Sequence, residues 1–280
     1  MASTTTDSLK VPGATIYYEV SGSGPVLLCI PGGPTDAGMF ADLAARLADR
    51  YTVVRYDPRG HSRSPLDGAP ADLPPAVHAE DAAVLLAAVT DEPAVVYGNS
   101  GGGTIGLELL TRRPELVRRL VAHEAPIMEL LPDAEHLRAA LAEIAETYRT
   151  SGVFAAMGQF AALAEDGGPR YSEEMAQADP ETLGPPEMTE RMAGNLDLFV
   201  AHELGPIAGY VPDVATLKEH AAKLVSAAGE TSGEQAACRA ACALAERVGI
   251  EVSLLPGAHG GWGSDPQDFA DRLDSLLRSP

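Results

Sequence analysis

The sequence has little cysteine, with only Cys29, Cys238 and Cys242 among 280 residues. An odd number without regular spacing does not make a disulfide framework, and this favours a reducing compartment. Cys29 lies in an apolar run, where a free thiol behaves as a small hydrophobic side chain. No further Cys or His accompanies Cys238 and Cys242 at the spacing of a zinc motif. We therefore expect no metal and no cofactor.

Basic side chains are also scarce, because 20 Lys and Arg stand against 40 Asp and Glu and give a formal net charge of −20. Such a surface repels phosphate backbones and anionic lipid headgroups. No apolar run approaches the roughly 18 residues of a membrane-spanning helix. The polar segment 1–10 lacks the apolar stretch of a signal peptide. These features predict a cytoplasmic protein that acts on a small molecule, without a nucleic-acid or membrane partner, and they leave the oligomeric state open.

Short apolar runs alternate with helical patterns along most of the chain. The runs predict strands at about 15–20, 26–30, 52–56, 94–97, 120–122, 223–228 and 251–255. The helical patterns lie at about 39–48, 75–89, 101–112, 234–248 and 265–277. Strands that alternate with helices imply right-handed crossovers. The expected fold class is therefore α/β, with a mostly parallel central sheet flanked by helices.

The alternation stops after Pro126, and up to about Val211 the pattern is helical only. A chain of 280 residues can hold one large domain with an inserted subdomain. We therefore expect an α/β core formed by 1–126 and 212–280, and an inserted helical cap formed by 127–211.

One motif points to nucleophilic catalysis. Gly98 to Gly102 matches G-x-S-x-G and lies directly between a predicted strand and a predicted helix. A turn this tight needs small flanking residues, and it holds the Ser100 hydroxyl clear of the sheet. The following helix directs its free N–H groups toward developing negative charge. Ser100 is the predicted nucleophile, and the alternative is a glycine-rich turn with an incidental serine.

A second glycine-rich loop, Pro31 to Pro34, follows an earlier strand. Its glycines allow close approach of the backbone to a ligand. The expected oxyanion donors are the backbone N–H of Gly101, directly after the nucleophile, and that of Gly33 in this loop.

The two motifs, together with Asp57 to Ser62 and Pro256 to Gly260, resemble the α/β-hydrolase superfamily in its helical-cap branch. Their order and spacing fit over nearly the whole chain. The resemblance implies the α/β-hydrolase fold with an inserted cap and a Ser-His-acid triad. Many relatives have His at the start of the oxyanion loop, where this chain has Pro31. Because the donor there is a backbone N–H, the difference need not abolish the function.

The chain order of the family indicates the base. Of the seven histidines, His259 alone lies on a short glycine-rich loop after the last predicted strand, and it follows the nucleophile. A neutral imidazole there would take the Ser100 proton and return it to the leaving group.

The acid of the triad is ambiguous. Relatives usually carry Asp after the strand at about 223–228, where this chain has Glu230 as the nearest carboxylate. Some relatives take the acid from the preceding strand end, where Glu124 lies next to His123. The hypotheses are Glu230, then Glu124, and then neither of them.

Aromatic residues make up only 5% of the chain, and three of them, Phe154, Phe199 and Trp262, are candidates for the wall of an apolar acyl pocket. The predicted function is ester-like acyl hydrolysis of a small molecule through an acyl-enzyme, the chemistry of a serine esterase of class EC 3.1. Two alternatives remain open: carbon–carbon bond hydrolysis by the same triad, or an idle, ligand-binding relative.

Overall fold

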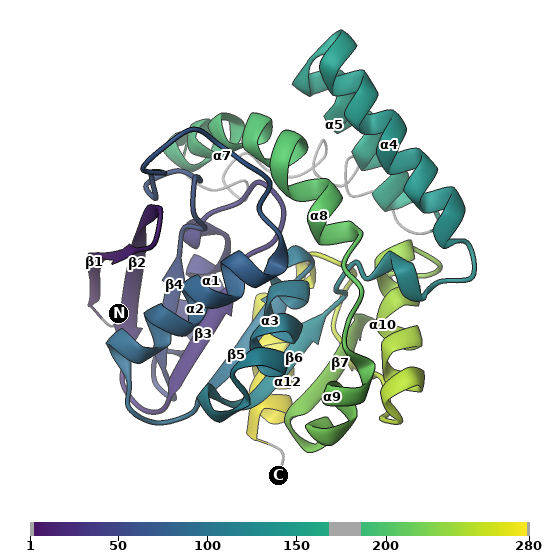
Figure 1. Ribbon diagram of the computed structural model, residues 1–280. Coiled ribbons are helices and arrows are strands. Elements are labelled where there is room, and N and C mark those ends of the chain that lie inside the picture. Colours follow the sequence, from purple (N-terminus) through teal and green to yellow (C-terminus); the bar gives the residue numbers. More distant parts are fainter. Residues whose placement is uncertain (1–2, 168–185, 279–280) are drawn as a thin grey trace.

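The computed structural model describes residues 3–167 and 186–278. Its centre is an eight-stranded sheet with the strand order β1-β2-β4-β3-β5-β6-β7-β8 (Figure 1). The strands are β1 (Thr4–Val11), β2 (Ala14–Gly22), β3 (Val26–Ile30), β4 (Thr52–Tyr56), β5 (Ala94–Asn99), β6 (Val117–His123), β7 (Leu224–Gly229) and β8 (Ser253–Leu255).

The sheet is mostly parallel, as the sequence predicts. Strands β4, β3, β5, β6, β7 and β8 pair in parallel, whereas β1 pairs antiparallel with β2 and β2 antiparallel with β4. The sequence does not predict β1. Its residues are almost all exposed, so it lacks the apolar alternation that marks a half-buried strand.

Helices cover both faces of the sheet. One face carries α2 (Pro75–Val89), α3 (Gly101–Arg112), α9 (Val214–Glu219) and α10 (Ala236–Val248), and the other carries α1 (Ala41–Leu47) and α12 (Pro266–Arg278). Successive strand residues point to opposite faces. In β3, Leu28 and Ile30 join the first hydrophobic cluster, and Leu27 and Cys29 join the second. Burial of both faces explains why this strand is a continuous apolar run.

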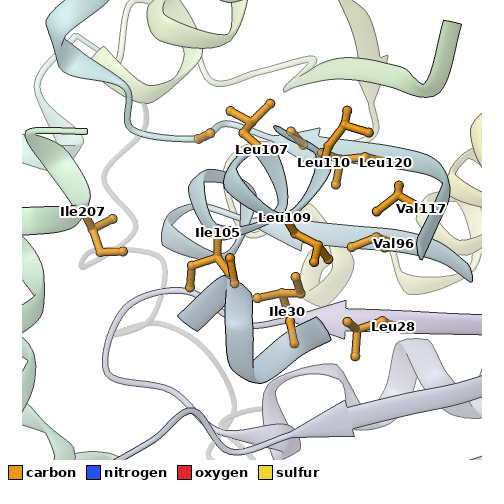
Figure 2. Packing of buried hydrophobic residues seen from close by; sticks show 14 of the residues in the cluster. Leu28, Ile30, Val96, Ile105, Leu107, Leu109, Leu110, Val117, Leu120 and Ile207 are labelled. Carbon is orange, nitrogen blue, oxygen red and sulfur yellow. The ribbon is translucent and has the colours of Figure 1, made fainter. Parts of the chain in front are cut away.

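Helix α3 is the best-packed helix of the first face. Figure 2 shows Ile105 and Leu109 of α3 close to Ile30 and Val96 of the sheet, with Ile207 approaching from the other side. Every residue from Gly101 to Leu110 is buried. This packing fixes the N-terminus of α3, and with it the turn that carries Ser100.

Between β6 and β7 the described chain is helical, and the main helices that precede α9 extend beyond the carboxyl edge of the sheet (Figure 1). They are α4 (Ala134–Ser151), α5 (Val153–Glu165), α7 (Pro186–Leu198), the π-helical turn η5 (Phe199–Glu203) and α8 (Leu204–Ala208). The hairpin α4–α5 packs on η5 and α8 in a small separate core, around Ile144, Ala156 and Phe199. Residues 168–185 of the expected cap 127–211 lie outside the described residues.

The predicted helices differ from the observed ones mainly at their ends. The pattern at 39–48 divides into a short 3-10 turn, η1 (Ala37–Phe40), followed by α1. The remaining short elements are η2 (Pro114–Leu116), η3 (Met128–Leu130), η6 (Ala221–Lys223) and α11 (Gly261–Ser264). In the described parts of the chain, no helix combines the length and apolarity that crossing a bilayer requires.

Candidate active site

Ser100 occupies a strained turn between β5 and α3. Its backbone has φ 54° and ψ −126°, a region that a residue with a side chain seldom adopts. The turn is held in place because the Ser100 N–H donates to the His123 carbonyl oxygen at 2.9 Å. Strain at a non-glycine residue that packing enforces is a feature of functional sites. Here it places the serine at the N-terminus of a buried helix.

The glycines on both sides of this turn are sterically required. A Cβ at Gly98 would lie 2.2 Å from the Gly102 carbonyl oxygen, and a Cβ at Gly102 would lie 2.0 Å from the Ile30 carbonyl oxygen. Both distances are far inside van der Waals contact, and the opposing atoms are backbone atoms that cannot move away. The G-x-S-x-G spacing therefore follows from the packing of α3 on β3 and β5.

The loop after β3 lies directly against this turn. A Cβ at Gly32 would lie 2.8 Å from the Gly101 nitrogen and 2.8 Å from the Ser100 Cβ, so only glycine fits there. Gly33 has φ +59°, a conformation that favours glycine. A Cβ at Gly101 would lie 3.8 Å from the Gly33 nitrogen. The backbone N–H groups of Gly33 and Gly101 thus belong to one small region beside Ser100.

The imidazole of His259 is bound by a buried carboxylate. His259 Nδ1 lies 2.6 Å from Glu124 Oε2, and the other carboxylate oxygen accepts from the Gly229 N–H at 2.7 Å. Glu124 is fully buried and has φ 48°, a second strained backbone in the site. It directly follows β6, and His259 follows β8. Strands β6 and β8 lie on either side of β7, and the carboxyl ends of these parallel strands meet at one edge of the sheet, which brings the two segments together.

Glu124 is charged over the whole physiological range. Burial alone would raise the pKa of this carboxyl, but the hydrogen bond and the charge of His259 outweigh it, and the pKa falls to about 2. A carboxylate in this state fixes the tautomer of His259 with the proton on Nδ1, and it leaves Nε2 free to accept a proton.

Glu230 does not reach His259 in this way. Its side chain is exposed, and its backbone N–H donates to the Leu255 carbonyl oxygen at 2.9 Å. Of the two glutamates that the sequence offers, the structure brings Glu124 to His259 and leaves Glu230 on the surface. Both residues follow strands at the same edge, so the choice depends on the local direction of each side chain.

Two further polar residues, which the sequence did not predict as part of the site, lie beneath it. Asn99 Nδ2 donates to the His259 carbonyl oxygen at 3.1 Å and lies 3.3 Å from His123 Nδ1. Asn99 and His123 are both buried, and the Tyr97 hydroxyl contacts the same His123 nitrogen at 3.1 Å. Asn99, the last residue of β5, thereby connects the loop of His259 to the strand that directly precedes Ser100. Its position inside the G-x-S-x-G motif was the available signal.

The three aromatic candidates do not form a common wall. Phe154 is 78% exposed on α5, which is incompatible with lining a pocket in this structure. Phe199 is buried and packs edge-on against Phe160 within the cap. Trp262 packs against Phe40 beside the second core cluster.

A different apolar side chain lies next to the nucleophile. A Cβ at Gly101 would meet Ile207 Cγ2 of α8 at 3.3 Å. Ile207 is 7% exposed. No sequence pattern marks it as a site residue, because aliphatic side chains in helices are most often ordinary core residues.

Known proteins resemble this chain in sequence and in fold. A family model described as the alpha/beta hydrolase fold matches residues 25–198. The chain belongs to the α/β-hydrolase fold family. An uncharacterized hydrolase of Bacillus subtilis (strain 168), YraK, is 34% identical to it over 276 residues, which cover 96% of this chain and 95% of that protein.

Solved structures share the fold of this α/β-hydrolase along its whole length. A thermophilic esterase from Thermogutta terrifontis has a TM-score of 0.74 at 19% identity, covering 99% of this chain and 98% of that chain. The enol-lactonase from Burkholderia xenovorans LB400 has a TM-score of 0.71 at 18% identity, covering 98% of this chain and 100% of that chain. Within residues 3–167 and 186–278, no group of three His, Cys, Asp or Glu side chains is arranged to hold a metal ion.

This α/β-hydrolase also has a buried charged cluster where the cap meets the core. Glu203 of η5 lies 2.9 Å from His61 Nε2 and 3.4 Å from His78 Nε2, and all three side chains are at most 6% exposed. Burial alone would raise the pKa of Glu203, but the two histidines lower it to about 2. Burial would lower the pKa of His61, but Glu203 raises it above its ordinary value. A buried ion pair therefore connects the cap to the core.

We expect Glu203→Gln to destabilise the protein by about 3 kcal/mol at pH 6, because it leaves the buried His61 without its counter-charge. The stabilisation that Glu203 provides is complete above its unfolded pKa, about 4.3, and is lost as the pH falls toward the folded value of about 2. The difference between variant and wild type should therefore shrink to under about 1 kcal/mol near pH 2.5.

Urea unfolding at pH 6 and at pH 2.5 measures both differences. Glu190→Gln, at an exposed position of α7, is the control and should change the free energy of unfolding by less than about 0.5 kcal/mol. If Glu203→Gln lowers the free energy of unfolding by the same amount at both pH values, Glu203 is not the charged group that stabilises the fold.

Proposed function

We propose that the protein hydrolyses esters of small molecules through an acyl-enzyme on Ser100, with His259 as the base and Glu124 as the acid. The observation that carries the proposal is the 2.6 Å contact between His259 Nδ1 and the buried Glu124 carboxylate, beside a serine with a strained backbone. A buried carboxylate, an imidazole and a strained serine are the components of nucleophilic acyl transfer.

Acylation would begin when Ser100 Oγ attacks the carbonyl carbon of the ester and His259 Nε2 takes the hydroxyl proton. The carbonyl oxygen becomes an oxyanion, which the Gly33 and Gly101 N–H groups would bind. Glu124 stabilises the imidazolium that forms. The tetrahedral intermediate then collapses, the bond to the leaving oxygen breaks, and His259 gives its proton to the departing alcohol.

Deacylation would repeat these steps with water. His259 removes a proton from a water molecule, whose oxygen attacks the acyl carbon. The second oxyanion is bound by the same two N–H groups. Its collapse releases the carboxylic acid and returns the proton to Ser100 Oγ.

Two observations favour catalysis of this kind over an idle relative. The sequence offers no Asp after β7, but Glu124 supplies a buried carboxylate to His259 from the end of β6. The similar folds include proteins described as a thermophilic esterase and an enol-lactonase. An ester is therefore the first substrate class to test.

Labelling with a fluorophosphonate tests the proposal directly. An activated serine displaces fluoride and forms a stable phosphonyl ester, whereas an ordinary serine hydroxyl is inert. We expect one label per chain, located by mass spectrometry on the peptide that contains Ser100, together with a burst of p-nitrophenol from p-nitrophenyl acetate.

Heat-denatured protein is the control for non-specific labelling. Native protein that takes no label would favour the idle relative. Labelling without turnover of p-nitrophenyl esters would direct the search to carbon–carbon bond hydrolysis by the same triad.

A further inference from the structure

The loop that carries Gly33 is held by side chains that have no role in the proposed chemistry. Thr35 Oγ1 donates to the Gly32 carbonyl oxygen at 2.6 Å. That carbonyl belongs to the same peptide group as the Gly33 N–H. Because a trans peptide is planar, its C=O and N–H point in opposite directions, and fixing one orients the other. Thr35 therefore sets the direction of the Gly33 N–H.

A second carbonyl of the loop, two residues after that of Gly32, is bound from the cap. Asn195 of α7 donates from Nδ2 to the Pro34 carbonyl oxygen at 3.1 Å, and its Oδ1 accepts from the Ser62 N–H at 2.7 Å. A carbonyl can only accept and an amide N–H can only donate, so these two partners fix the orientation of the Asn195 amide. Asn195 is 2% exposed. It lies 161 residues after Pro34, and it connects the cap to a loop of the core.

Two further residues of the loop have cap-linked partners. The Asp36 carboxylate, fully buried, accepts from Arg191 Nε of α7 at 2.6 Å. The Thr35 carbonyl oxygen contacts His61 Nδ1 at 3.2 Å, and His61 in turn contacts Glu203 of the cap. Three successive loop residues are thus bound directly or indirectly by cap helices. Glycine at φ +59° has wide conformational freedom, so Gly33 needs such external restraint to keep one orientation.

We propose that Thr35 and the cap residue Asn195 are positioning residues, which hold the Gly33 N–H in the direction needed to bind the oxyanion. The inference rests on the proposed acyl transfer at Ser100. It adds that the cap takes part in transition-state stabilisation through backbone geometry, in addition to any contact with substrate. Preorganised donors are effective because they need no reorientation during the reaction.

The experiment compares an ester with its thionoester. In O-p-nitrophenyl thionoacetate, sulfur replaces the carbonyl oxygen, and sulfur is a larger atom and a weaker hydrogen-bond acceptor. Donors in the oxyanion site therefore accelerate the thionoester less than p-nitrophenyl acetate. A variant that disturbs the donor should lose more rate on the ester, whereas one that only reduces the amount of folded enzyme loses the same factor on both.

For Thr35→Val, which keeps the shape and removes the hydroxyl, we expect kcat on p-nitrophenyl acetate to fall about 10-fold or more, because loss of a whole oxyanion donor costs about 10²–10³. KM should stay within about threefold. The ester-to-thionoester rate ratio should fall at least about fivefold, since part of the donor's effect is lost. Thr35→Ser restores a hydroxyl and should recover most of kcat.

Asn195→Asp tests the cap. It keeps an acceptor for the Ser62 N–H but replaces the donor to the Pro34 carbonyl by an oxygen. As for Thr35→Val, kcat on the ester and the ester-to-thionoester rate ratio should both fall. Asp197→Asn, which lies on the same helix and contacts Tyr148 within the cap, is the matched control and should leave both rates within about twofold. Should Asn195→Asp fail to fold, Arg191→Gln, at a partly exposed side chain, takes its place with the same expected pattern.

Unchanged kcat in Thr35→Val and in the cap variant, or equal losses on the ester and the thionoester, would overturn the inference. This outcome differs from failure of the proposed function, in which the wild-type protein itself takes no fluorophosphonate label and hydrolyses neither substrate.

Discussion

Ser100→Ala is expected to lower kcat for p-nitrophenyl ester hydrolysis by about five orders of magnitude, because the proposed mechanism has no second nucleophile. His259→Ala should cost a similar factor, and the double variant little more, since the two residues act on one proton transfer. Neither change removes a core side chain. The circular dichroism spectrum of both variants should therefore remain close to wild type. The melting temperature of Ser100→Ala should also be unchanged, whereas that of His259→Ala should fall because the buried Glu124 carboxylate loses its partner. Initial rates at saturating ester, corrected for spontaneous hydrolysis, measure the effect.

Ser151→Ala is the matched control for the serine, because Ser151 lies exposed at the end of α4. It should retain wild-type kcat. Wild-type turnover by Ser100→Ala would remove Ser100 from the mechanism, and additive losses in the double variant would separate the serine from the histidine.

Glu124→Gln is expected to lower kcat by about 10³–10⁴-fold, with a small change in KM. The variant is nearly isosteric, but the amide can present its NH2 group to His259 Nδ1 in place of an oxygen. It would then favour the tautomer with the proton on Nε2, which cannot accept the Ser100 proton. The neutral amide also no longer stabilises the imidazolium, so the loss should appear in kcat.

Glu230→Gln is the control for this prediction, because it replaces the same carboxylate by the same amide at an exposed position after the neighbouring strand. It should change kcat by less than about twofold. A loss in Glu230→Gln as large as that in Glu124→Gln would contradict the assignment of the acid to Glu124, and small losses in both would mean that neither glutamate serves.

Local sequence patterns were enough to predict the elements of the core. Strands β3 and β4 and helices α2 and α3 have the predicted bounds, because continuous apolar runs and 3.6-residue periodicity depend on burial that each segment encodes itself. Strand β1 was not predicted, for the opposite reason. Its exposed residues carry no apolar pattern, and it is a strand only because β2 offers it a free edge.

By itself the sequence determined the family and the glycine-rich turn at Ser100. The glycines are required because a Cβ at Gly98 would overlap the backbone of the first turn of α3, and a Cβ at Gly102 would overlap the backbone of β3. Such constraints act over short distances and leave a visible motif. Only the tertiary structure decided which glutamate contacts His259, since Glu124 and Glu230 follow neighbouring strands and differ in the direction of their side chains. It also brought Asn195 to the loop of Gly33 across 161 residues, a contact between packed segments that no local pattern records.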